Sequence, residues 1–129
     1  MRTIVAAAIL VSANLAVADD FPARVQVGKS ALRSQVAQEY ESSWAPQVSE
    51  AMTACTTHGI KPSGGVERFA FVGNISAEGK VSDIEVRPKT ALSLCFAKHF
   101  NNAQLPPPPK ALLNGDRLLP VADELELRS

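Results

Sequence analysis

The side chains with the greatest chemical capacity in this 129-residue chain are its two cysteines, Cys55 and Cys95, and its two histidines, His58 and His99. A cysteine beside a histidine is the pairing that nucleophilic catalysis and metal binding both use. No spacing signature of either chemistry surrounds these residues, and so small a set of ligands does not suffice for most structural zinc sites. We therefore predict no metal site, no cofactor and no catalytic thiol.

Paired carboxylates are the other candidates for acid–base chemistry. Glu39 and Glu41 stand two apart in a predicted helix and therefore point away from each other. Asp83 and Glu85 stand two apart in a predicted strand, where they share a solvent-exposed face. The chain also has no Gly-rich phosphate loop, no serine-nucleophile elbow and no His-Glu-x-x-His motif. We predict that the protein is not an enzyme.

The N-terminus has the layout of a secretory signal peptide. A short basic head at 1–3 precedes the apolar run 4–18, which ends in the small-x-small pattern Ala16-Val17-Ala18. An uncleaved membrane anchor is the alternative, but a span needs about 20 apolar residues and this run is shorter and contains polar side chains. We predict a signal peptide at 1–18 and a mature chain at 19–129 without a membrane span, located in the periplasm or secreted.

Export changes what the cysteines are expected to do. Oxidising compartments convert such pairs to disulfides, so we predict a bond between Cys55 and Cys95. Closing a loop of this length restricts the unfolded chain and stabilises the fold by roughly 4 kcal/mol. A catalytic cysteine is the competing interpretation, and a paired cysteine cannot be a nucleophile.

Composition limits the class of protein further. Apolar residues make up 46% and charged residues 20% of the chain, which is typical of a globular protein, and the length fits one domain. The 13 basic residues are balanced by 13 acidic ones, so the net charge is zero. Because phosphate binding needs a clustered basic surface, we predict that nucleic acid is not the partner.

The first half of the mature chain is predicted to be an extended arm followed by helices. Alternating valines indicate an extended arm or short edge strand at 19–29, and Ser30 is the expected cap of a helix that runs to about Ser43. Pro46 predicts either a kink or a fresh helix start, and Gly59 is a plausible stop.

The second half is predicted to be a hairpin, a helix and a last strand. Alternation on both sides of a turn at 77–80 predicts a β-hairpin from Val66 to Pro88, and Thr90 is the expected cap of an amphipathic helix. The prolines at 106–109 end that helix, and 112–127 is expected to be extended. The predicted fold class is α+β, a small two-layer domain with an antiparallel β-hairpin and a C-terminal strand packed against two helices. The predicted core is Leu32, Val36, Met52, Phe69, Phe71, Ile84, Val86, Leu92, Phe96 and Phe100.

The segment from Phe69 to Pro109 resembles the C-terminal domain of TonB-type energy transducers. The turn and second strand read Gly79-Lys80-Val81-Ser82-Asp83-Ile84-Glu85-Val86, which is similar to the Gly-x-Val-x-x-x-x-Val pattern of that group. The single Cys95 in the following helix, and the exit at Leu105-Pro106-Pro107, are more similar to the cysteine-bearing AgmX/PglI-type relatives. TonB-type transducers keep an N-terminal anchor, whereas this chain has a cleavable signal, so the resemblance implies a stand-alone periplasmic module.

The resemblance also implies where a partner binds. In such folds the last strand lies at the margin of the sheet, and a free sheet edge binds extended peptides by strand addition. The expected function is that of a non-catalytic, exported module that binds a protein partner; the alternative is a secreted inhibitor or immunity protein that blocks the active site of a toxin or hydrolase. The candidate contact residues on the edge are Leu118, Val121, Glu124, Leu125 and Leu127.

The signal peptide gives the first testable prediction. Protein purified from the cell envelope should begin at Asp19, because the peptidase cuts after the small residue Ala18. Intact-mass spectrometry measures this directly. A mass that still includes residues 1–18 would contradict the prediction.

Overall fold

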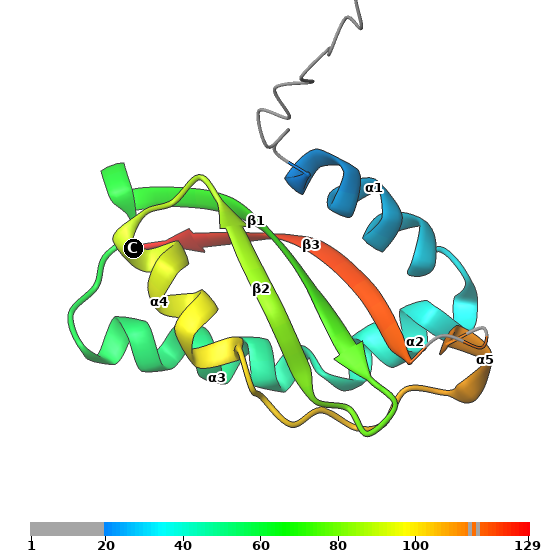
Figure 1. Cartoon of the computed structure of the whole chain (residues 1–129). Coiled ribbons are helices and arrows are strands. Elements are labelled where there is room, and N and C mark those ends of the chain that lie inside the picture. The colour runs from blue at the N-terminus through cyan, green and yellow to red at the C-terminus, as the bar shows by residue number, and fades with distance from the viewer. Residues whose placement is uncertain (1–19, 114, 116) are drawn as a thin grey trace, which may run out of the picture.

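The computed structural model describes residues 20–113, 115 and 117–129 (Figure 1). The predicted signal peptide at 1–18 lies outside these described residues. The elements, in chain order, are helices α1 (Phe21–Ala31), α2 (Gln35–Ser43) and α3 (Ala45–Thr57), a 3-10 turn (Ser63–Gly65), strands β1 (Val66–Ser76) and β2 (Val81–Arg87), helices α4 (Ala91–Phe100) and α5 (Lys110–Leu113), and strand β3 (Leu118–Arg128).

The three strands form one antiparallel sheet in the order β2-β1-β3. β1 is the central strand, and it pairs with β3 over the whole length of both, from Val66 opposite Arg128 to Ser76 opposite Leu118. The sheet and its helices confirm the predicted α+β class, including the hairpin and the C-terminal strand. The segment expected to be extended from residue 112 instead begins with the short helix α5.

A β-bulge in β2 shapes the hairpin. Between Val72 opposite Glu85 and Asn74 opposite Ser82, β2 carries one more residue than β1, and Asp83 there has a φ of 54°. The extra residue shifts the alternation of β2 by one position. For this reason β2 can direct its apolar side chains to the core both before and after the bulge, where the buried residues are Val81 and Val86.

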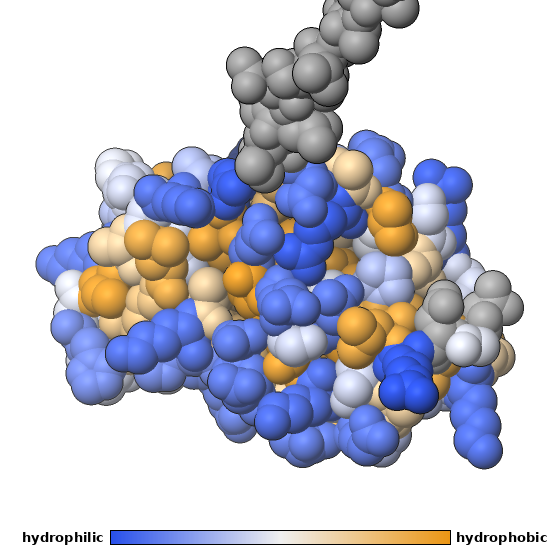
Figure 2. Space-filling view, viewed as in Figure 1, coloured by the Kyte–Doolittle hydropathy of each residue, from blue (hydrophilic) through white to orange (hydrophobic). Residues whose placement is uncertain are grey.

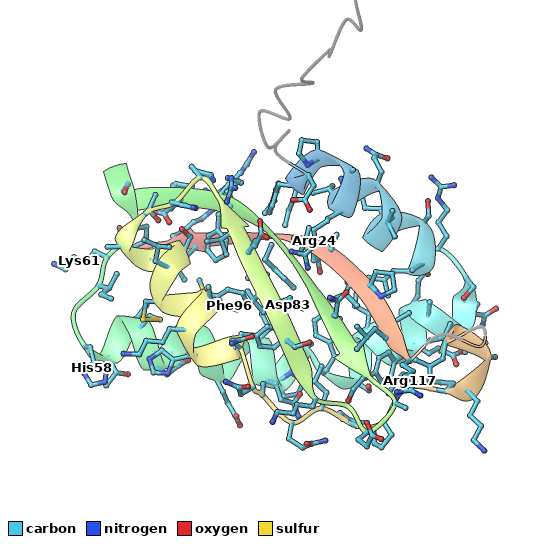
Figure 3. All side chains as sticks on the ribbon, viewed as in Figure 1. Arg24, His58, Lys61, Asp83, Phe96 and Arg117 are labelled. Atoms are coloured by element: carbon cyan, nitrogen blue, oxygen red, sulfur yellow. A yellow bond between two sulfur atoms is a disulfide. The ribbon has the colours of Figure 1, made fainter. Side chains whose placement is uncertain are left out.

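The main core lies on the inner face of the sheet, which α2, α3 and α4 cover. Phe71 of β1 is at its centre and is fully buried. Its ring centroid lies 5.3 Å from that of Phe96, 5.6 Å from that of Phe100 and 6.5 Å from that of Trp44. Figure 3 shows Phe96 projecting from α4 toward this core. Aromatic packing of this kind adds to the free energy gained from burial alone.

The predicted arm at 19–29 is wrong, because residues 21–31 form helix α1 on the outer face of the sheet (Figure 1). Phe21 and Val25, one helical turn apart, pack there with Val72 and Ala122. Gly28, one turn further, brings the helix so near β3 that an added Cβ would lie 2.6 Å from the Cβ of Ala122. The alternation of Val25 and Val27 was misleading, because Val25 packs on the sheet whereas Val27 is 54% exposed.

The start of the second helix also differs from its prediction. Ser34, and not Ser30, caps α2, since the Ala37 N–H donates to its Oγ at 3.1 Å. With this start, Val36 lies 46% exposed instead of in the core. The remaining predicted core residues are buried or packed against the core. Pro46 stands in the first turn of a fresh helix, α3, which begins at Ala45.

Much of the visible surface away from α4 is hydrophilic (Figure 2). Apolar side chains gather at the end of the molecule where α4 lies, and Leu94 of that helix is 50% exposed. Among the described residues, no helix is both long enough and apolar enough to cross a membrane.

The second prediction tests the core. Phe71→Ala should lower the free energy of unfolding by about 3–5 kcal/mol, because it removes a fully buried ring and leaves a cavity. The matched control is Val36→Ala on the exposed side of α2, which should change it by less than about 0.5 kcal/mol. Denaturant unfolding measures both, and equal losses in the two variants would contradict this core.

Candidate functional site: the open edge of β3

The two margins of the sheet are β2 and β3, and they differ in how far they are covered. At the Val81 end of β2, the segment after α4 covers the outer side of the strand. The Val81 N–H donates to the Ala103 carbonyl at 3.0 Å, and the Leu105 N–H donates to the Gly79 carbonyl at 2.9 Å. The bulge at Asp83 distorts the rest of this margin. Among the described residues, no strand pairs with the outer side of β3. β3 is therefore the edge that an added strand can use.

Three observations show which residues of β3 direct their backbone groups outward, away from β1. Pro120 has no N–H to give to a ladder, and proline is confined to such outward positions in sheets. The Glu124 N–H donates to the side chain of the preceding residue, Asp123 Oδ1, at 2.8 Å, and so does not bond to β1. The Ser129 N–H, by contrast, donates at 2.9 Å to the Gly65 carbonyl on the β1 side. The backbone N–H and C=O groups of even-numbered residues of β3 thus point outward from the sheet edge, and those of odd-numbered residues bond to β1.

Helix α1 limits the usable part of this edge. It packs against the first half of β3, as the close approach of Gly28 to Ala122 shows. Its last turn reaches as far as Glu124 through Lys29, whose Nζ lies 3.9 Å from the Glu124 carboxylate. We therefore define the docking edge as the outward backbone groups of the second half of β3, at Glu124, Glu126 and Arg128.

The residues predicted as contacts fall into different environments. Leu118 is 42% exposed, but it lies at the beginning of β3, outside the docking edge. Val121 is 1% exposed and belongs to the core. Leu125 and Leu127 are half-buried on the inner face, and Glu124 is exposed on the docking edge. Of the five predicted residues, Glu124 alone belongs to the docking edge.

A groove runs along the inner side of the docking edge, between β3 and the corner where α2 meets α3. Its volume is about 380 Å³. We call it the α2–β3 groove. Its lining includes Glu41 and Trp44, Ala45 and Val48 of α3, and Asp123 and Leu125 of β3.

Two carboxyl groups meet in this groove, one from each wall. Burial, a side-chain hydrogen bond with Asp123 and the charge of Asp123 together raise the pKa of Glu41 from 4.5 to about 7. The Asp123 carboxylate also accepts the N–H of Glu124, so it links the docking edge to α2. Sequence reasoning missed this pair, although Asp123 was visible as the one polar residue in an otherwise apolar alternation at 119, 121, 125 and 127.

Trp44 adds an unsatisfied donor to the same region. It lines the groove and is 1% exposed, and its indole Nε1 has no hydrogen-bond acceptor among the described residues. A buried donor without an acceptor lowers the stability of the fold.

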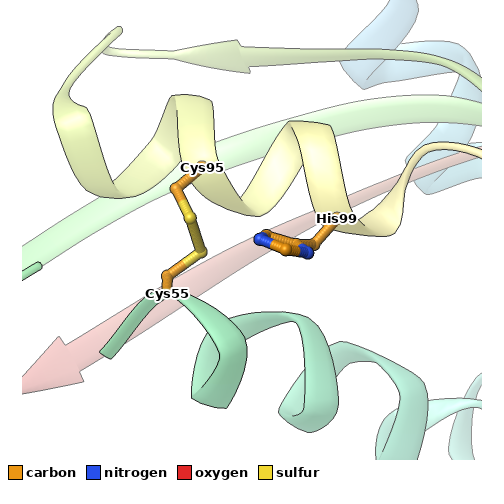
Figure 4. A group of neighbouring side chains, drawn as sticks. All are labelled: Cys55, Cys95 and His99. Atoms are coloured by element: carbon orange, nitrogen blue, oxygen red, sulfur yellow. A yellow bond between two sulfur atoms is a disulfide. The ribbon is translucent and has the colours of Figure 1, made fainter. Parts of the chain in front are cut away.

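The predicted disulfide is confirmed. Cys55 of α3 and Cys95 of α4 are bonded, with their Cα atoms 5.9 Å apart (Figure 4). His99 stands one turn after Cys95, and its nearest ring nitrogen and the two sulfur atoms all lie within 4.8 Å of one another. Because the sulfurs are bonded to each other, neither is a thiolate that could attack a substrate or hold a metal. His58 lies apart from this group, at the end of α3 (Figure 3).

Comparisons of the chain with family models, with curated proteins and with solved structures found no match. We therefore infer a function from the geometry of the docking edge and its groove. The TonB-type resemblance remains a prediction from the hairpin and helix motifs.

The third prediction concerns the carboxyl pair. With a pKa of about 7 when folded and 4.5 when unfolded, Glu41 keeps a proton in the native state that the unfolded chain releases. The contribution of this retained proton to the free energy of unfolding is complete below pH 4.5 and is lost as the pH rises toward and through 7. Glu41→Gln, which stays neutral, should therefore have a higher melting temperature than the native chain at pH 8, and a similar one at pH 4.5.

The control for this measurement is Glu39→Gln, an exposed position on the same helix. Its melting temperature should follow that of the native chain at every pH. If the Glu41→Gln and native curves run parallel from pH 4.5 to 8, the proton on Glu41 does not contribute to stability.

Proposed function

We propose that the protein is an exported, non-catalytic binding module that takes up an extended segment of a protein partner at the docking edge of β3. The observation that carries this proposal is the row of outward backbone groups at Glu124, Glu126 and Arg128, which no strand among the described residues pairs with. Such groups bind another chain by extending the hydrogen-bonded ladder, without needing particular side chains.

One outward N–H of the docking edge, that of Glu124, is already hydrogen-bonded within the chain. Asp123 Oδ1 accepts the Glu124 N–H and thereby satisfies one of the outward donors while no partner is present. Capping of this kind reduces pairing between edges of two copies, which is the usual hazard of an exposed edge strand. A partner strand would replace this bond with a backbone carbonyl, which releases the Asp123 carboxylate toward the α2–β3 groove.

The proposed location is the periplasm or the extracellular space. The basic head, apolar run and Ala16-Val17-Ala18 support cleavage and export. The disulfide between α3 and α4 supports an oxidising compartment, because reducing compartments keep thiols free. The TonB-type resemblance of the hairpin supports the same setting and is part of this proposal.

The fourth prediction tests the docking edge with two proline variants. Glu124→Pro removes an outward N–H and no bond to β1, so the fold should survive while capture of the envelope partner is lost. Leu125→Pro removes an N–H that faces β1, so this variant should unfold instead. Melting temperature and a pull-down, with the captured protein identified by mass, measure the two effects.

Glu124→Ala is the matched control, since it removes the side chain and keeps the amide; it should capture the partner as the native chain does. Equal capture by the Pro and Ala variants would place the contact elsewhere. A tight one-to-one complex that abolishes the activity of a captured enzyme, formed equally by both variants, would support the inhibitor alternative.

A further inference from the structure

The acidic groups around β3 fall into two sets. On the outer face, Glu124 is paired with Lys29, and Glu126 with Arg68 at 3.0 Å. The hydrogen bond from Arg68 holds the pKa of Glu126 below its ordinary value. The two carboxyl groups of the α2–β3 groove, Glu41 and Asp123, have no cationic nitrogen of the described residues within 4.0 Å. The surface beside the docking edge therefore has two acidic groups that are not paired with a cation of the described residues.

The position of Asp123 fixes where a partner's side chain would lie. Asp123 is on the inner face of β3, two residues before Leu125, and both line the groove. In paired strands, side chains directly opposite each other have Cβ atoms about 4.5–5.5 Å apart on the same face. A strand added at the docking edge would thus place one side chain over Asp123 and another over Leu125.

We infer that the α2–β3 groove takes a lysine or arginine side chain from the bound segment, next to an apolar side chain, two residues away, that packs on Leu125. This inference rests on the proposed function of β3. Charge complementarity decides among occupants, because an acidic side chain would be repelled by Asp123 and a neutral one would desolvate the carboxylate without compensation.

The site should respond to pH. The charged groups that face it are Glu41 from α2 and Asp123 from β3, while α3 contributes the uncharged Ala45 and Val48. With a pKa of about 7, Glu41 is mostly protonated at pH 6 and mostly ionised at pH 8. A basic side chain therefore meets about one more negative charge at pH 8, and its binding should be tighter there.

The fifth prediction uses three blocked nonapeptides of alternating valine and threonine that differ at the central residue, which is lysine, glutamine or glutamate. The probe with lysine should bind the disulfide-bonded mature chain about tenfold more tightly than the probe with glutamine at pH 8, as expected for one charge-assisted hydrogen bond. The probe with glutamate should bind most weakly. Titration followed by amide NMR measures the affinities and shows whether the Glu126 and Arg128 amides become protected.

Two variants separate the roles of the carboxyl groups. Glu41→Gln should remove the gain in lysine-probe affinity between pH 6 and pH 8, whereas the control Glu39→Gln should retain it. Asp123→Asn should reduce the preference for lysine over glutamine at both pH values. A gain with pH that Glu41→Gln leaves unchanged would contradict the assignment of that gain to Glu41.

The outcomes also distinguish failure of this inference from failure of the proposed function. If all three probes protect the edge amides with equal affinity, the basic occupant is wrong and strand addition stands. If no probe protects them, both are wrong. If protection appears without a probe and rises with protein concentration, the edge binds a second copy of the chain, and the inference is overturned.

Discussion

The antiparallel pairing of β1 with β3 is the constraint on which the remaining structure depends. In the order β2-β1-β3, β3 lies at the margin of the sheet, and no strand of the described residues pairs with its other side. The register, which sets Phe71 opposite Asp123, also fixes the face to which each side chain of β3 points. The same alternation that buries Val121 in the core turns the amide of Glu124 outward and places Asp123 over α2. Core and docking edge are therefore two consequences of a single register.

Helices pack on both faces of the sheet. On the inner face, α3 and α4 are tied by the disulfide and hold the aromatic cluster around Phe71. On the outer face, α1 packs on the first half of β3. Arg24 of α1 also contacts β2, where the Arg24 Nη2 donates to the Asp83 carbonyl at 2.9 Å (Figure 3). This cover leaves the second half of the strand as the part that a partner can reach. In the proposed function, the location of the binding site follows from where α1 ends.

Sequence patterns predicted the elements with strong local signals. The hairpin, the capped helix after Thr90, the terminal strand and the disulfide each had a clear period, cap residue or chemical rule behind them. Helix α1 was missed because few of its residues are buried, and because Gly28, which has low helix propensity, is explained only by the approach of Ala122. The Glu41–Asp123 pair was missed for a related reason. It joins a helix to a distant strand, and the contact follows from a register and a helix position that no local pattern encodes.

Amide hydrogen exchange along β3 in the free mature protein tests the central claim most directly, since it reports the orientation of each backbone group. We predict slow exchange at Val121, Asp123 and Leu125, whose amides face β1, and fast exchange at Glu126 and Arg128 on the docking edge. Slow exchange at these two residues in monomeric protein would show that the edge is already paired. The open edge would then not exist, and both the proposed function and the basic occupant of the groove would be contradicted.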